Sequence, residues 1–128
     1  MISWFEKHNA LSWAITILIA IFIFYFSMLT FEGVGGDGGI KNWMSIVYHI
    51  VIFFFLSLFL FISLIKGKSN SKLFLFVILV LISYGVLDEI HQFFVQGRFC
   101  TVIDVFFDLI GILFAFMVYL ILLKQKKL

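Results

Sequence analysis

Polar and ionisable side chains interrupt an otherwise apolar sequence in its second half. Tyr84, Asp88, His91 and Gln92 are spaced at offsets of 0, 4, 7 and 8, which places them on one stripe of a helix, and Glu89 is turned away from that stripe by about 100°. A carboxylate at the centre of a lipid-spanning helix costs at least about 2.5 kcal/mol, so such groups usually face inward and are functional. The stripe therefore predicts a functional or ion-paired centre.

A second stripe follows at Asp104, Asp108, Gly111 and Ala115, with offsets of 0, 4, 7 and 11. Asp104, taken alone, favours a helix cap, because an aspartate at a helix start stabilises the free amides by about 1 kcal/mol. Asp108 lies one turn deeper and has no such explanation. We expect the two small residues to let this helix approach the helix of the first stripe closely, below the two aspartates.

His49 adds an imidazole from a third apolar segment. Counted at about 1.5 Å per residue from the outer helix ends, Asp88 lies about 12 Å deep, Asp108 about 10 Å and His49 about 9 Å. With Ser45 and Tyr48 beside His49, we expect a water-accessible cavity that opens outward above a floor of Phe and Leu. A lone histidine in a membrane can also serve only to hydrogen-bond across helices.

These groups are unbalanced in charge. Four carboxylates face the obligatory cation Arg98 and the two histidines His49 and His91. Protonation of one or two carboxyls, a salt bridge from Arg98, or a bound cation would each relieve the imbalance. Oxygen and imidazole ligands suit Mg²⁺, Mn²⁺, Ca²⁺ or Zn²⁺. The candidate ligands of such a divalent cation are Asp88, Glu89, Asp104, Asp108 and His49.

The elements that must position these side chains are membrane-spanning helices. Of the 128 residues 64% are hydrophobic and 12% are charged, whereas soluble domains are about half apolar and a quarter charged. Four apolar stretches of about 20 residues or slightly more are each long enough to cross a bilayer. We predict an all-α membrane protein, a single transmembrane domain over residues 1–128 with no soluble domain, and helices at about 10–31, 43–65, 73–96 and 101–123.

The lysines predict the orientation of these helices. Placing both termini in the cytoplasm keeps seven of the nine basic residues inside and leaves only Lys41 and Arg98 outside. The polar cluster then lies on the extracytoplasmic side of the cell membrane. Because the basic residues are spread over several short loops, a nucleic-acid partner is excluded. Cys100 is the single cysteine, so an intrachain disulfide is excluded as well.

The segment 87–98, followed by Asp104, Asp108 and Gly111, resembles the signature of the VanZ-like family of small membrane proteins. That pattern is approximately D-E-x-x-Q, then G-R, then D-x-x-x-N-x-x-G. His49 is similar to a histidine that the family carries in its second helix. Asp108 departs from the pattern, because the family usually has Asn there, and the change adds a negative charge to the cluster.

The resemblance implies a role in the cell envelope. The family's namesake lowers susceptibility to the lipoglycopeptide antibiotic teicoplanin, which describes a phenotype and not a reaction. The implied partners are membrane lipids together with a lipid-linked envelope precursor or a lipoglycopeptide.

Three functions fit these residues. The first is a membrane-embedded hydrolase or transferase acting on a lipid-linked substrate. Its catalytic candidates are Asp88, Glu89, His91, Asp108 and His49, and its substrate-binding candidates are Arg98, Gln92, Asp104 and Tyr84. Arginine suits an anionic headgroup through its planar fork of donors.

The second is a protein that binds a lipid or amphiphile without turning it over, in which Arg98 and Lys41 matter more than Asp88. The third, ranked last, is a proton- or ion-coupled carrier, acting alone or as an oligomer, because four short helices leave little room for a pathway in one copy. The sequence does not decide between enzyme and binding protein.

Overall fold

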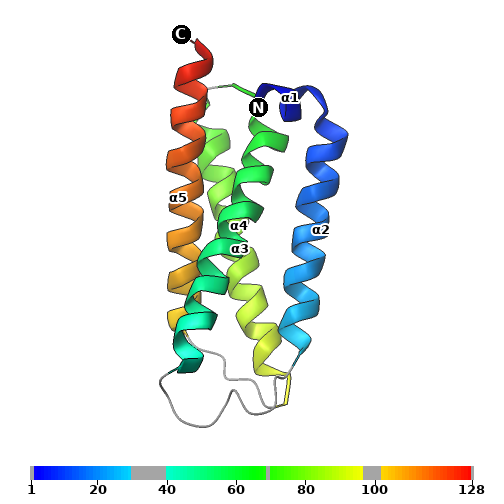
Figure 1. Ribbon diagram of the computed structural model, residues 1–128, viewed down its shortest axis with the longest axis vertical. Helices are drawn as coiled ribbons and strands as arrows, with labels where there is room; N and C mark the ends of the chain where they lie inside the picture. Colours follow the sequence, from blue (N-terminus) through cyan, green and yellow to red (C-terminus); the bar gives the residue numbers. More distant parts are fainter. Residues whose placement is uncertain (1, 30–39, 69, 97–101, 128) are drawn as a thin grey trace.

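The computed structural model describes residues 2–29, 40–68, 70–96 and 102–127, and these ranges are helices joined by turns. Five helices follow one another along the chain (Figure 1): α1 (Ile2–Lys7), α2 (Asn9–Met28), α3 (Ile40–Ile65), α4 (Ser71–Phe93) and α5 (Val102–Lys127). The described residues contain no strand. The all-helical prediction is therefore confirmed.

Four of these helices are long and apolar enough to cross a membrane. The spans are Asn9–Met28, Trp43–Ile65, Ser71–Phe93 and Val102–Lys126. Their outward faces carry large apolar side chains, such as Leu18 on α2, Phe76 on α4 and Phe114 on α5, which are exposed to 64%, 56% and 65%. Apolar side chains exposed on every long helix are what a lipid environment requires, and we describe the chain as a multi-pass membrane protein.

The ends of the helices differ from the prediction by a few residues. α2 ends at Met28, because Leu29 has an extended backbone conformation. α4 begins at Ser71, where the Asn70 side chain accepts hydrogen bonds from the backbone N–H groups of Lys72 and Leu73 at 3.0 and 3.4 Å. α5 continues through its terminal lysines, which are good helix formers outside lipid.

The short helix α1 was not predicted. It folds back against the bundle, where the ring of Phe5 packs edge-on against Phe59 with centroids 5.4 Å apart. Its Glu6 accepts hydrogen bonds from Lys126 Nζ at 2.5 Å and from the Tyr119 hydroxyl at 3.3 Å. The Tyr119 hydroxyl in turn accepts from Gly67 N at 3.2 Å. These bonds join α1, the α3–α4 turn and the end of α5.

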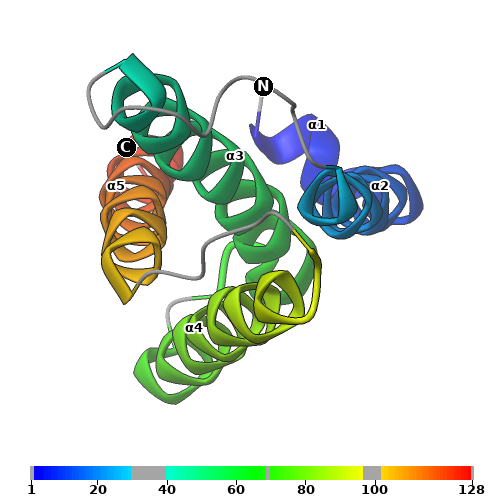
Figure 2. The same cartoon turned by 90° about the horizontal axis from the view of Figure 1, so that it is seen from below.

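α3 is the central helix of the bundle and contacts each of the other four (Figure 2). Its inward side chains Phe53 and Phe61 are fully buried, together with Ile112 and Tyr119 of α5. α2 lies on the opposite side of α3 from α5 and also contacts α4. The site described below lies between these helices.

Gly111 packs against α3, which corrects the prediction that it would bring α5 close to α4. A Cβ atom at this position would lie 2.5 Å from the Ile50 carbonyl oxygen and 3.0 Å from Phe54 N. The prediction was wrong because spacing along one helix shows which residues share a face, but not which helix that face contacts. The backbones of α3 and α5 can approach this closely only because residue 111 has no side chain.

The two ends of the bundle differ in character. Both termini lie at one end in Figure 1, together with the α3–α4 turn and its lysines. His49, Asp88 and Asp108 lie nearer the other end, because each is within nine residues of the helix terminus there. This separation agrees with the predicted topology, and the side of the membrane that each end faces stays a prediction.

Candidate functional site

A buried pair of ionisable side chains joins α3 to α5. Nδ1 of His49 lies 2.8 Å from Oδ1 of Asp108, and the two residues are exposed to only 3% and 1%. Gly111 lies three residues beyond Asp108, and the close backbone approach that it permits brings this part of α5 against α3. An ionised carboxylate only accepts hydrogen bonds, so Nδ1–H is the donor when Asp108 is ionised, and Nε2 is then left for other partners.

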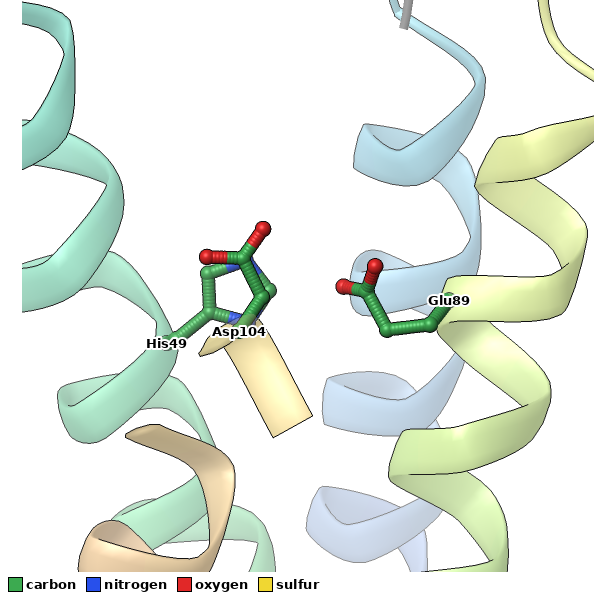
Figure 3. Close-up of side chains that lie close together, drawn as sticks. All are labelled: His49, Glu89 and Asp104. Carbon is green, nitrogen blue, oxygen red and sulfur yellow. The ribbon is translucent and has the colours of Figure 1, made fainter. Parts of the chain in front are cut away.

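Two more carboxylates lie against the same imidazole. Glu89 of α4 extends toward His49 and Asp104 of α5 (Figure 3), and one ligand atom from each of the three residues lies within 4.8 Å of the others. Glu89 is buried and Asp104 is half-buried. We call His49, Glu89, Asp104 and Asp108 the acid–histidine centre. Side chains from α3, α4 and α5 therefore meet in this centre, with Glu89 in the place that the depth estimate gave to Asp88.

Asp88 is turned toward α2. Its Oδ1 accepts a hydrogen bond from the Ser27 hydroxyl, and its Oδ2 accepts one from Gln92 Nε2 at 2.9 Å. Consecutive helical residues point about 100° apart, so Asp88 and Glu89 contact different neighbours. Sequence reasoning placed both in one cluster and missed Ser27. The sequence contained one indication of this contact: Ser12, Thr16 and Ser27 are spaced so that they share one face of α2, and all three are buried.

Replacing Ser27 with alanine should destabilise the protein by about 1.5–3 kcal/mol, because it removes a hydrogen bond to a buried charged group. The free energy of unfolding, measured by denaturant titration in mixed micelles, tests this. The matched control is Ser83→Ala on α4, whose exposed hydroxyl donates only to the Leu79 carbonyl one turn earlier. Equal stability of the two variants would contradict the contact between Ser27 and Asp88.

The remaining members of the first stripe also face α2. The Tyr84 hydroxyl donates to the Ala20 carbonyl oxygen at 2.6 Å. The His91 ring stacks on Phe24, with centroids 4.4 Å apart and planes 12° from parallel. The predicted stripe therefore attaches α4 to α2, and Glu89, which lies off the stripe, faces His49.

Several predicted residues lie outside the part of the chain that the structure describes. Arg98, Cys100 and the glycine-rich segment at 33–39 are in this group. Lys41 belongs to α3, but its side chain is not described. The proposed capture of an anionic group by Arg98 therefore stays a prediction.

An apolar groove of about 520 Å³ runs between α2 and α3, beside the centre. Its lining is Phe22, Phe26, Trp43, Met44, Val47, Tyr48, Val51 and Ile52. Tyr48 belongs to this lining, and its ring packs edge-on against the His49 ring with centroids 5.6 Å apart. His49, Glu89 and Asp108 are at most 3% exposed and this groove is apolar, so the predicted water-accessible cavity stays a prediction.

Comparison with known families decides what kind of protein this is. The sequence matches the family described as VanZ/LLP1 over residues 12–123, which spans α2 to α5 almost completely. The chain belongs to the VanZ/LLP1 family. No curated protein and no solved structure matches it.

The structure shows how the signature residues of this VanZ/LLP1 protein are distributed. The acidic pair of the signature divides between two environments: Asp88 binds Ser27 on α2, and Glu89 faces His49. Gln92 donates to Asp88 and so supports the α2 side. Asp108, where the family usually has Asn, holds the histidine. The oxygen of an Asn side chain could accept the same hydrogen bond from Nδ1.

Proposed function

We propose that this VanZ/LLP1 protein is a membrane-embedded hydrolase or transferase that acts on a lipid-linked substrate of the cell envelope. The observation that carries the proposal is the buried His49–Asp108 pair with Glu89 and Asp104 gathered against the same imidazole. Ionisable groups collected from three helices at this depth are costly unless they do chemistry or bind a ligand.

The acid–histidine centre contains the groups that acid–base catalysis requires. Asp108 fixes the orientation of the His49 ring, as the aspartate does in serine-protease triads. Imidazole and two further carboxylates are then able to take a proton from an attacking water or hydroxyl and return one to the leaving group. These steps suit cleavage or transfer of an ester or phosphoester headgroup.

The groove between α2 and α3 supports a substrate that carries a hydrocarbon chain. Its lining is aromatic and aliphatic, and it lies within two membrane spans. A chain held there would place its headgroup near Tyr48 and His49, nearer the end of the bundle remote from the two termini. With the predicted topology, that end faces the extracytoplasmic side, where Arg98 would hold an anionic headgroup. The resemblance to the teicoplanin-resistance protein favours a substrate whose conversion alters susceptibility to lipoglycopeptides.

Replacing His49 with glutamine should lower turnover by about 100-fold or more, because general acid–base groups contribute factors of this size. The assay incubates purified protein in nanodiscs with lipid-linked envelope precursors and follows their masses, and teicoplanin susceptibility is measured in cells that express each variant. The matched control is His8→Gln, since His8 is exposed at the opposite end of the bundle. Unchanged precursor conversion in a folded His49→Gln variant would remove the catalytic proposal.

The apolar groove also favours a second function, binding of an amphiphile without turnover. In that case a lipid co-purifies with the protein and keeps its mass on prolonged incubation. Filling the groove with Val47→Trp should then abolish binding, whereas His49→Gln should preserve it. The enzyme hypothesis predicts that both substitutions reduce conversion.

A further inference from the structure

We propose that the acid–histidine centre is a site for one divalent transition-metal ion, Zn²⁺ or Mn²⁺, held by His49, Glu89 and Asp104 and oriented by Asp108. The role of the ion deepens the proposed function and rests on it. Binding of the ion rests on the geometry alone and can be measured separately.

The spacing of the three ligand atoms fits a single ion. They lie within 4.8 Å of one another. Nitrogen and oxygen ligands bind Zn²⁺ at about 2.0–2.2 Å in tetrahedral geometry, so neighbouring ligand atoms are about 3.4 Å apart. The three atoms must therefore each move inward by up to about 1 Å, which rotation about the Glu89 and Asp104 side-chain bonds can supply. The ligands come from α3, α4 and α5, so the ion would join three helices.

The His49–Asp108 hydrogen bond prepares the histidine for a metal. Metal-binding histidines commonly donate their second ring N–H to a carboxylate, which fixes the ring and makes the ligating nitrogen more basic. Nδ1 of His49 is already bonded to Asp108 at 2.8 Å. Nε2 is then the nitrogen available to an ion between Glu89 and Asp104, the two side chains shown beside the ring in Figure 3.

An independent observation is the charge around Asp108. Its Oδ2 is buried and has no hydrogen-bond partner among the described residues, and the residue is only 1% exposed. A buried carboxylate without a compensating charge is strongly unfavourable, and a neutral His49 that binds a metal through Nε2 supplies a hydrogen bond to Asp108 but no charge. The lysines whose side chains are described lie in or next to α1, the α3–α4 turn and the end of α5, where Lys126 binds Glu6. A divalent cation bound to Nε2, on the other side of the His49 ring, would offset this charge together with those of Glu89 and Asp104.

The ligand set selects the class of ion. One imidazole and two carboxylates suit Zn²⁺ or Mn²⁺, whereas Ca²⁺ takes six to eight oxygen ligands. Three protein ligands leave at least one position for water or a substrate oxygen, which is typical of catalytic sites. A metal-bound water in this position would supply the nucleophile for the hydrolysis proposed above, and His49 would then act as a ligand and not as the proton acceptor.

The test is metal content and spectroscopy on the full-length protein in nanodiscs. After treatment with a chelator, the protein is dialysed against Zn²⁺, Mn²⁺ or Co²⁺, and bound metal is measured by mass spectrometry, with Co²⁺ absorption bands reporting the ligands. We expect about one ion per chain in the wild type. His49→Ala and Glu89→Gln should lose the ion, and Asp108→Asn should bind it 10–100-fold more weakly, the effect usual for a ligand's supporting partner.

Matched controls separate the site from adventitious binding. Asp88→Asn changes the neighbouring carboxylate that binds Ser27, and His8→Gln removes an exposed histidine, so both should keep the ion. A wild-type chain that retains none of the three metals overturns the proposal without any need for a folded variant. Retention by His49→Ala or Glu89→Gln overturns it as well. Bound metal without turnover refutes the proposed enzyme and leaves the site. Turnover in metal-free protein refutes the catalytic role of the ion and leaves the enzyme, and the metal content of the wild type then decides the site by itself.

Discussion

Replacing Gly111 with alanine is expected to lower the free energy of unfolding by about 3 kcal/mol or more, at or above the upper end of the usual range for overpacked cores. The added Cβ would lie 2.5 Å from the Ile50 carbonyl oxygen and 3.0 Å from Phe54 N. Both atoms belong to the backbone of α3, so no side-chain rotation can relieve the overlap. The helices must separate, which also breaks the packing around Phe53 and Ile112. Denaturant titration in mixed micelles and the amount of monodisperse protein recovered measure the effect.

The control for this substitution is Leu113→Ala, two residues further along α5. Leu113 is 54% exposed on the outer face, so its truncation should change the free energy of unfolding by no more than about 0.5 kcal/mol. Wild-type stability in Gly111→Ala would show that α3 and α5 do not approach this closely. Because His49 and Asp108 come from the same two helices, Gly111→Ala should also reduce metal binding in whatever folded protein remains.

The fold could be predicted from the sequence because length and composition decide it. A run of about 20 apolar residues crosses a bilayer, and the four predicted runs correspond to α2, α3, α4 and α5. α1 was missed because six residues give too little periodicity to recognise a helix, and its position depends on contacts with Phe59 and Lys126, which are distant in sequence.

The candidate site was only partly predictable for a related reason. Helical spacing placed Glu89 off the stripe of Asp88, Gln92 and Tyr84, and the structure shows the same separation. What spacing cannot show is which face meets which neighbour. The stripe meets α2 and not the centre, and Gly111 meets α3 and not α4. Both errors came from assuming that helices adjacent in the chain share the closest interface.

Removal of either partner of the His49–Asp108 pair is expected to cost about 3–5 kcal/mol of unfolding free energy. Each single variant, His49→Leu or Asp108→Val, leaves the other polar group buried at 3% exposure or less without its hydrogen-bond partner. The apolar replacements are chosen to match the volume of the residue removed as nearly as possible. Space at position 108 is tight, because a Cβ atom added at Gly85 would lie only 2.9 Å from Asp108 Oδ2. The single variants therefore report the cost of an unpaired group and not of a large cavity.

The double variant His49→Leu/Asp108→Val is expected to recover most of that stability and none of the function. Replacing a buried ion pair by apolar residues of similar volume is often neutral or stabilising, because the cost of removing two charges from water disappears with the pair. Denaturant titration of the four proteins forms a double-mutant cycle, which should give a coupling energy of about 3 kcal/mol or more. The same four proteins are assayed for bound metal and precursor conversion, and only the wild type should show either. A coupling energy below about 0.5 kcal/mol would mean that the two side chains act independently. A stable double variant without activity would instead show that this pair is kept for chemistry, since the fold itself is more easily built without it.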